Sequence, residues 1–136
     1  MDLLIYKAKL ILSRFFKVHQ CHFEKNKSRK VKVIEARRFL CYYLRNELNL
    51  SFKQITEQIP AITNHATAIH HCKKLQELFF AEKKLQSKYN SFLRILKEDA
   101  DFYILTEIKD LHSTRSSITS KINKLKKLLI TKKPKS

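Results

Sequence analysis

The pattern of hydrophobic and polar residues indicates helices along the whole chain, and no segment has the alternation of a strand. Residues 3–16 carry an apolar stripe at helical spacing, formed by Leu4, Ala8, Ile11, Leu12 and Phe15. After a polar, basic connector at 23–30, a second stripe predicts a helix from Val33 to about Leu48. Arg37 and Arg38 fall beside that stripe, where they serve either as surface charges or as phosphate ligands.

Two further helices are predicted around a tight connector. Ser51 and Gln54 form a capping-box pattern at the start of one helix, which Pro60 ends. Asn64 can then cap a new helix that begins at His65. A short helix, a tight connector and a new helix form a helix-turn-helix.

The helix from His65 is predicted to have one apolar and one polar side. The apolar side holds Ala68, Ile69, Cys72, Leu75 and Phe79, and the rest of the surface holds Ala66, Thr67, His70, His71, Lys73 and Lys74. A later stripe of Leu78, Leu85, Tyr89, Phe92 and Leu96 is rotated by roughly a third of a turn. One straight helix cannot bury both stripes in one core. We therefore predict a break near Phe80–Lys83, or a second partner for the later stripe.

The C-terminal part of the chain carries a heptad seam in which one residue is polar: Ile104, Ile108, Leu111, Arg115, Ile118, Ile122, Leu125 and Leu129. The segment EDAD at 98–101 is expected to form the bend and the start of this helix. The helix can fold back on residues 84–97 as a hairpin, or pair with another chain as a homodimer. We expect an all-α fold, with a helix-turn-helix bundle at 1–97 and a helical heptad extension at 98–136 that forms a hairpin or a coiled coil.

Charge narrows the classes of partner. The 29 Lys and Arg against 12 Asp and Glu give a formal charge of +17, which favours nucleic acid first and an anionic membrane surface second. Residues 3–16 could form an amphipathic anchor, but packing inside the domain is the better interpretation. Lys7 and Arg14 interrupt the segment, so neither a signal peptide nor a membrane span is expected, and the protein should be cytoplasmic.

Composition argues against several chemistries. The chain has no glycine, which excludes recognisable phosphate-binding loops of nucleotide-dependent enzymes. His70, His71 and Cys72 with His19, Cys21 and His22 would supply metal ligands by number, but their spacing matches no zinc site. No motif places a nucleophile with a base. We expect a non-enzyme without metal, cofactor or small-molecule substrate.

Several segments resemble, in order, the C-terminal DNA-binding domain of the bacterial replication initiator DnaA. These are ILSRFFKVHQCHF at 11–23, KSRKVKVIEARRFLCYYLR at 27–45, LSFKQITEQI at 50–59 and NHATAIHHCKKL at 64–75. The last is similar to the family signature D-H-T-T-V-x-H-A-C-R-K-I. The similarity extends through Leu96, and residues 100–136 lie outside it.

The resemblance implies specific contacts with duplex DNA. The residues that would face base edges in the major groove are Asn64, His65, Ala66, Thr67, His70 and His71, although the two later histidines fit solvated helix surface equally well. The basic loop at 27–32 would place Arg29 or Lys30 in the minor groove. The phosphate contacts would be Lys32, Arg38, Lys53, Lys73 and Lys74.

The chain departs from the family pattern in ways that affect specificity. Asn64 replaces an Asp, and Ala66 replaces a Thr, which keeps a methyl group for thymine but loses a hydroxyl. The connector is one residue longer and lacks the family's glycines, and the ATPase module is missing. We therefore expect a stand-alone protein, encoded by a cell or by a phage or mobile element, that binds double-stranded DNA in replication initiation control or transcriptional regulation. The alternatives are a helical protein–protein interaction module with weak or non-specific nucleic-acid binding, and a protein that binds structured RNA.

Overall fold

The computed structural model describes residues 2–25, 28–98 and 100–132. Within these residues it contains six α-helices, one 3-10 helix and no strand, which confirms the all-α prediction. Contacts divide the chain into two units, Met1–Ala100 and Asp101–Ser136. Residue 27 of the predicted basic loop and residue 99 of the predicted bend lie outside the described residues.

The helix α1 (Asp2–Phe15) packs on two other helices of the first unit, α2 and α5. It buries Ile5, Ala8, Leu10, Ile11 and Leu12. Leu4 is 42% exposed and Phe15 is half-buried, so the predicted stripe is wrong at these two residues. A helix that contacts two neighbours buries a wider arc than a single stripe, and this arc lies toward Ile5 and Leu10.

The end of α1 takes a Schellman arrangement without a glycine. The backbone N–H of Val18 donates to the carbonyl of Ser13 at 2.8 Å, and that of Lys17 donates to the carbonyl of Arg14 at 3.3 Å. Lys17 has a φ of 56°, in the left-handed region that favours glycine. The chain then enters the 3-10 helix η1 (Gln20–Phe23), which the sequence pattern did not predict and which buries Phe23.

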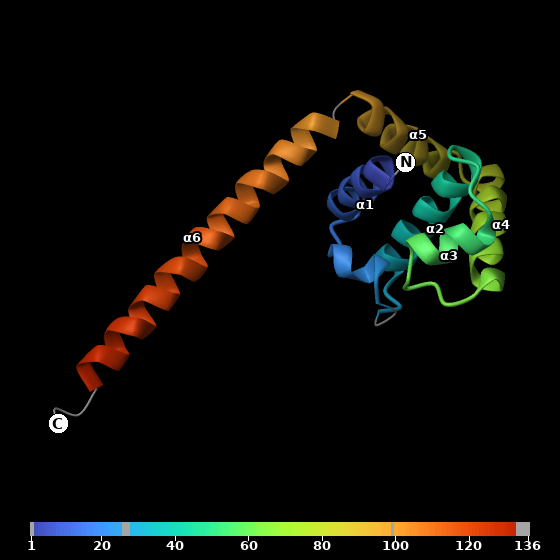
Figure 1. The fold of residues 1–136 in the computed structure, drawn as a ribbon. Coiled ribbons are helices and arrows are strands. Elements are labelled where there is room, and N and C mark those ends of the chain that lie inside the picture. Colours follow the sequence, from blue (N-terminus) through green and yellow to red (C-terminus); the bar gives the residue numbers. More distant parts are fainter. Residues whose placement is uncertain (1, 26–27, 99, 133–136) are drawn as a thin grey trace. The chain divides into compact units, whose positions relative to one another are not determined.

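The central helix of the first unit is α2 (Val31–Asn46), which contacts α1 and α4 (Figure 1). It begins and ends two residues earlier than predicted. Its apolar face buries Val33, Ala36, Phe39, Leu40, Cys41, Tyr43 and Leu44. Phe39 meets the ring of Phe16 edge-on at 4.9 Å between centroids and that of Tyr89 at 5.5 Å. This aromatic cluster joins three helices in one core.

The two helices predicted around the tight connector are α3 (Phe52–Gln58) and α4 (His65–Ala81). The capping box is confirmed: Ser51 Oγ accepts the N–H of Gln54 at 3.2 Å, and Gln54 Oε1 accepts the N–H of Ser51 at 2.9 Å. The connector is packed into the core, with Ala61 and Ile62 each 3% exposed. Its Ala61 N–H donates to the carbonyl of Phe23 at 3.0 Å, which ties the turn to η1.

The predicted break between the two apolar stripes is confirmed. α4 ends at Ala81, Glu82 has extended backbone with φ −130° and ψ 100°, and α5 (Lys83–Glu98) follows. The change of direction lets Leu85, Tyr89 and Phe92 enter the same core as the face of α4. The later stripe therefore needs no second partner.

The second unit contains α6 (Ala100–Lys132), a helix of 33 residues. The side chains described between residues 101 and 128 are all exposed, including those of the heptad seam. The side chains of Ile104 and Leu129, the two ends of the predicted seam, lie outside the description. The partner segment of the predicted hairpin is already used, because the apolar face of α5 is buried inside the first unit. The fold-back hairpin and the pairing with another chain both stay predictions.

Candidate nucleic-acid interface

The first turn of α4 is capped and open to solvent. Asn64 has extended backbone, and its Oδ1 accepts the N–H of Thr67 at 2.9 Å. The hydroxyl of Thr67 donates to the same oxygen at 3.1 Å. His65 and Ala66 are exposed, and Thr67 is half-buried. The prediction of Asn64 as N-cap is confirmed, and its side-chain oxygen Oδ1 already accepts the two hydrogen bonds from Thr67.

The opposite face of α4 is fixed in the core. It packs against α2, α3 and α5 and buries Ala68, Cys72, Leu75 and Phe79. Because this face is anchored by three neighbours, α4 cannot turn about its axis without breaking the core. The direction in which His65 and Ala66 project is therefore set by the fold.

The two adjacent histidines of α4 have different surroundings. His70 is exposed, whereas His71 is 9% exposed, so the expectation that both lie on the polar surface is wrong for His71. Burial lowers the pKa of His71 to about 4, and the positive charges of Arg38, His70 and Arg37 add to that shift. His71 Nδ1 is buried without a hydrogen-bond partner among the described residues. A neutral, buried imidazole is not available to a base edge.

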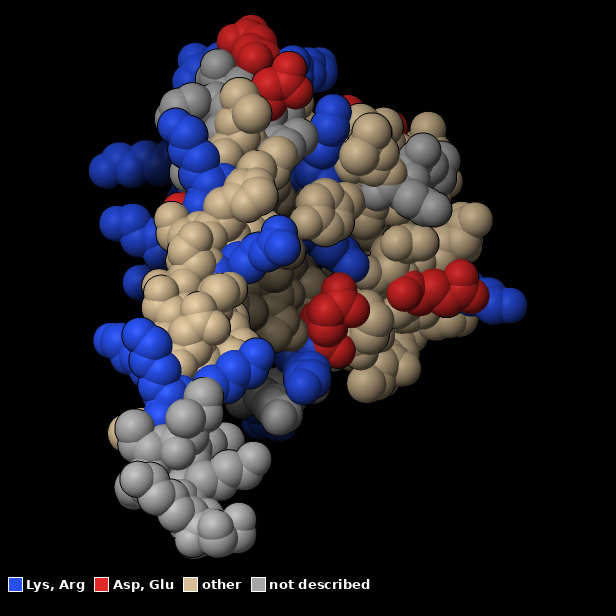
Figure 2. Space-filling model, turned by 60° about the vertical axis from the view of Figure 1, so that its left-hand side comes forward, with Lys and Arg blue, Asp and Glu red and all other residues tan. Residues whose placement is uncertain are grey.

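The residues predicted to contact phosphate come from three helices. Lys32 at the start of α2, Lys53 in α3 and Lys73 in α4 are exposed, while Lys74 and Arg38 are half-buried. Arg38 Nε is buried without a hydrogen-bond partner among the described residues. Figure 2 shows Lys and Arg side chains distributed over one face of the protein, with fewer Asp and Glu among them.

The segment before α2 holds the two candidates for the minor groove. Arg29 and Lys30 are exposed, and Lys30 is the N-cap residue of α2 without a side-chain cap bond. Lys30 also lines a cleft, whose other lining residues are Lys17, His19, His22, Lys32 and the valines Val18, Val31 and Val33. The described part of the loop thus presents cationic side chains next to the start of α2.

Arg37 holds this loop in place and is a residue that sequence reasoning misassigned. It is 5% exposed, so it is neither a surface charge nor a phosphate ligand. Its Nε donates to the carbonyl of His22 at 2.8 Å, Nη1 to that of Ser28 at 3.1 Å and Nη2 to that of Lys25 at 3.0 Å. Burial lowers the pKa of Arg37. Its spacing of four from Val33 and three from Leu40 places it on the buried face, a signal present in the sequence.

A second arginine joins α2 to α3. Arg45 Nη1 donates to the carbonyl of Leu50 at 3.0 Å, and its guanidinium lies 4.4 Å from the ring centroid of Phe52. The contact combines a charged hydrogen bond with a cation–π interaction at the start of α3.

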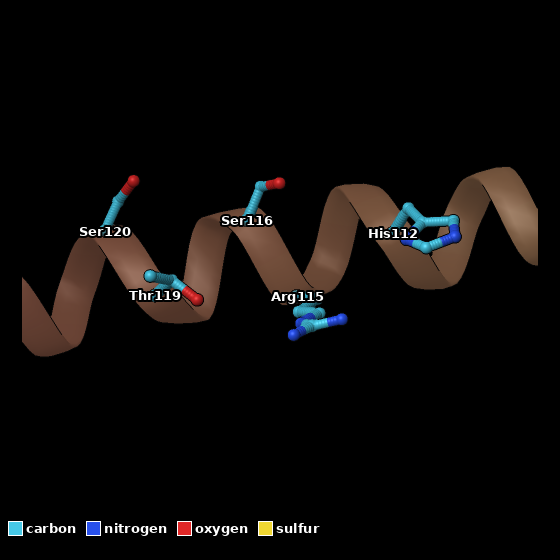
Figure 3. Close-up of a pocket in the computed structure, with 5 residues that line it drawn as sticks. All are labelled: His112, Arg115, Ser116, Thr119 and Ser120. Atoms are coloured by element: carbon cyan, nitrogen blue, oxygen red, sulfur yellow. The ribbon is translucent and has the colours of Figure 1, made fainter.

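Polar side chains on α6 form the remaining candidate for chemistry. A shallow hollow is lined by His112, Arg115, Ser116, Thr119 and Ser120 (Figure 3). All five side chains are exposed. Among the described residues, no three His, Cys, Asp or Glu side chains are grouped so that they could hold a metal ion. In the same part of the chain, no helix combines the length and apolar character needed to cross a bilayer.

Comparison with known protein families gives no matching family model, and the comparison with curated proteins gives no match either. The resemblance to the DnaA domain stays a prediction.

Proposed function

We propose that this protein binds double-stranded DNA through its helix-turn-helix, with the first turn of α4 in the major groove. The single observation that supports this most is the capped, exposed start of α4 on a helix whose opposite face is buried against three neighbours. A rigid helix with an open N-terminal turn is the element that helix-turn-helix proteins place against base edges. The biological role that we propose for this DNA binding is replication initiation control or transcriptional regulation.

The side chains divide by function in this proposal. His65, Ala66, Thr67 and His70 contact base edges, and Asn64 acts through the cap that orients Thr67. Arg29 and Lys30 approach the minor groove from the loop that Arg37 holds. The phosphate contacts are Lys32, Arg38, Lys53, Lys73 and Lys74. His71 takes no part in base contact, because it is buried.

Electrostatics supports a polyanionic partner. Phosphate neutralisation by Lys and Arg supplies most of the affinity of such proteins and releases condensed counterions. The formal charge of +17 supplies an excess of cations for such contacts. Arginine and lysine side chains from the loop, α2, α3 and α4 contribute to this phosphate neutralisation.

A salt titration tests the proposal. If about 6–8 phosphates are contacted, affinity for duplex DNA should fall by about three decades or more between roughly 50 and 200 mM salt. Gel-shift or fluorescence-anisotropy titrations measure it, with structured RNA of equal length and charge in parallel. A flat salt response would contradict the proposal, and tighter binding to RNA at every salt concentration would favour the RNA alternative.

A further inference from the structure

An exposed apolar row runs along α6. The seam residues whose side chains are described are Ile108, Leu111, Ile118, Ile122 and Leu125, and they are 45–61% exposed. They alternate at spacings of four and three once Arg115 is included, so they share one side of the helix. Monomeric proteins rarely expose a continuous apolar surface of this length, so the row indicates a partner.

The nearest candidate within the chain is not available. Fold-back pairing would require the apolar face of α5, but Leu85, Tyr89 and Phe92 are at most 9% exposed. They are packed among the aromatic rings of the first unit. The apolar face of α5 is therefore not free to cover the row on α6.

Charge along α6 selects the kind of partner. Residues 100–113 contain three acidic residues and one lysine, whereas residues 115–132 contain six basic residues and no acid. Two copies of this helix in parallel would place six cations of one beside six of the other. In the antiparallel arrangement, the basic half of each copy lies beside the acidic half of its partner.

We propose that α6 pairs with α6 of a second copy of this chain as an antiparallel coiled coil. In the register that overlaps the whole row, Ile122 faces Leu111 of the second copy and Ile118 faces Arg115 of the second copy. A single charged residue in a seam costs stability but fixes the register. The pairing does not depend on DNA.

The surroundings of Arg115 fit this central place. In Figure 3 its side chain leaves the helix on the side opposite to Ser116 and Ser120. The hollow that it shares with Thr119 and His112 gives the long side chain room to bend away from the seam. Its guanidinium can then reach water while its methylene groups stay on the apolar surface.

Sedimentation of the full chain at several concentrations, without nucleic acid, tests the pairing. We expect a monomer–dimer equilibrium that Ile122→Glu weakens at least tenfold. Asn123→Glu is the matched control, because it adds the same charge at the next, exposed position outside the row. Replacing Arg115 by Leu should tighten association, since it removes the charge from the seam.

Spin-label distances test the orientation in a Cys21→Ser background, which removes the exposed thiol. A label at Leu105→Cys should give a distance of about 35 Å between copies, because 23 residues at 1.5 Å separate the two sites in the antiparallel register. A parallel pair would place the same labels within about 20 Å. A label at Thr114→Cys, near the centre, should give a short distance in either orientation and serves as the control for association.

Several outcomes would overturn the inference. These are a monomer at every concentration, equal weakening by both glutamate variants, a short distance at residue 105, and association that appears only with added duplex or anionic vesicles. Failure here is separable from failure of the proposed function. The sedimentation contains no DNA, and the Ile122→Glu monomer keeps the helix-turn-helix for binding assays.

Discussion

At the scale of single residues, two side chains of basic residue types are buried, the Arg37 guanidinium and the neutral His71 imidazole. Arg37 forms three hydrogen bonds to loop carbonyls, and His71 occupies the core with no partner for Nδ1 among the described residues. Neither was predicted to be buried, because charge is a strong signal for the surface. Their roles differ. Arg37 donates hydrogen bonds to backbone carbonyls, whereas protonation of His71 lowers the stability of the folded protein.

Stability should fall with acid because of His71. Its folded-state pKa is about 4, and an unfolded histidine has a pKa near 6.5. Between these values the unfolded state binds the extra proton, so the free energy of unfolding decreases as pH falls, by up to about 1.4 kcal/mol per pH unit. Denaturant unfolding at several pH values measures this slope. In His71→Leu the slope between pH 6.5 and 4 should become shallower, and an unchanged slope would rule out His71 as its source.

Removal of the Arg37 guanidinium should loosen the basic loop. We expect Arg37→Met to lower the free energy of unfolding by about 2–3 kcal/mol, because three hydrogen bonds to a charged donor are lost. Arg38→Met, at the next position of the same helix, should cost less than about 1 kcal/mol. Denaturant titration gives both values, and hydrogen exchange should show faster exchange near residues 22–28 in Arg37→Met alone. Similar losses from the two variants would contradict the role assigned to Arg37.

At the scale of elements, the features that could be predicted from the sequence were mostly those formed by residues close together along the chain. The caps at Ser51 and Asn64 depend on neighbours three residues away, so the sequence contains the whole interaction. The break at Glu82 followed from two stripes that one straight helix could not bury. The burial of His71 had a signal in the sequence, because it is three residues from Ala68 and four from Leu75. The shifted stripe of α1 depends on which helices lie beside it, and periodicity within one segment does not contain that information.

The geometry of the first turn predicts different roles for two residues of α4. On a sequence obtained by selection from random duplexes, Thr67→Ala should weaken binding by about 1–3 kcal/mol. The difference in affinity between the selected duplex and a random duplex should therefore become smaller. Lys74→Ala should weaken binding to both equally, because a phosphate contact is independent of sequence. Thr67→Ser keeps the hydroxyl that donates to Asn64 and removes the methyl group. This variant therefore distinguishes the contribution of the methyl group to binding from that of the hydroxyl. Equal losses on both duplexes from Thr67→Ala would refute its assignment to base contact.

At the scale of the whole molecule, the two units suggest two separable activities. The first unit carries the candidate interface, and the second carries the exposed row of α6. In an antiparallel pair, each copy joins its first unit to the opposite end of the coiled coil. The described helix is 33 residues long, so the two attachment points are about 50 Å apart. Adjacent half-sites of helix-turn-helix dimers lie about 34–36 Å apart, one turn of duplex.

The two ends of the coiled coil are thus farther apart than adjacent half-sites, and we predict that such a dimer holds two duplexes. If both proposals hold, a duplex fixed to beads should capture a second, labelled duplex when the protein is present. Ile122→Glu should abolish capture while it leaves binding to a single duplex unchanged, because the variant lies in α6. Asn123→Glu should capture as well as the parent chain. Capture that survives in Ile122→Glu would mean that bridging comes from the basic surface of one molecule and not from the coiled coil.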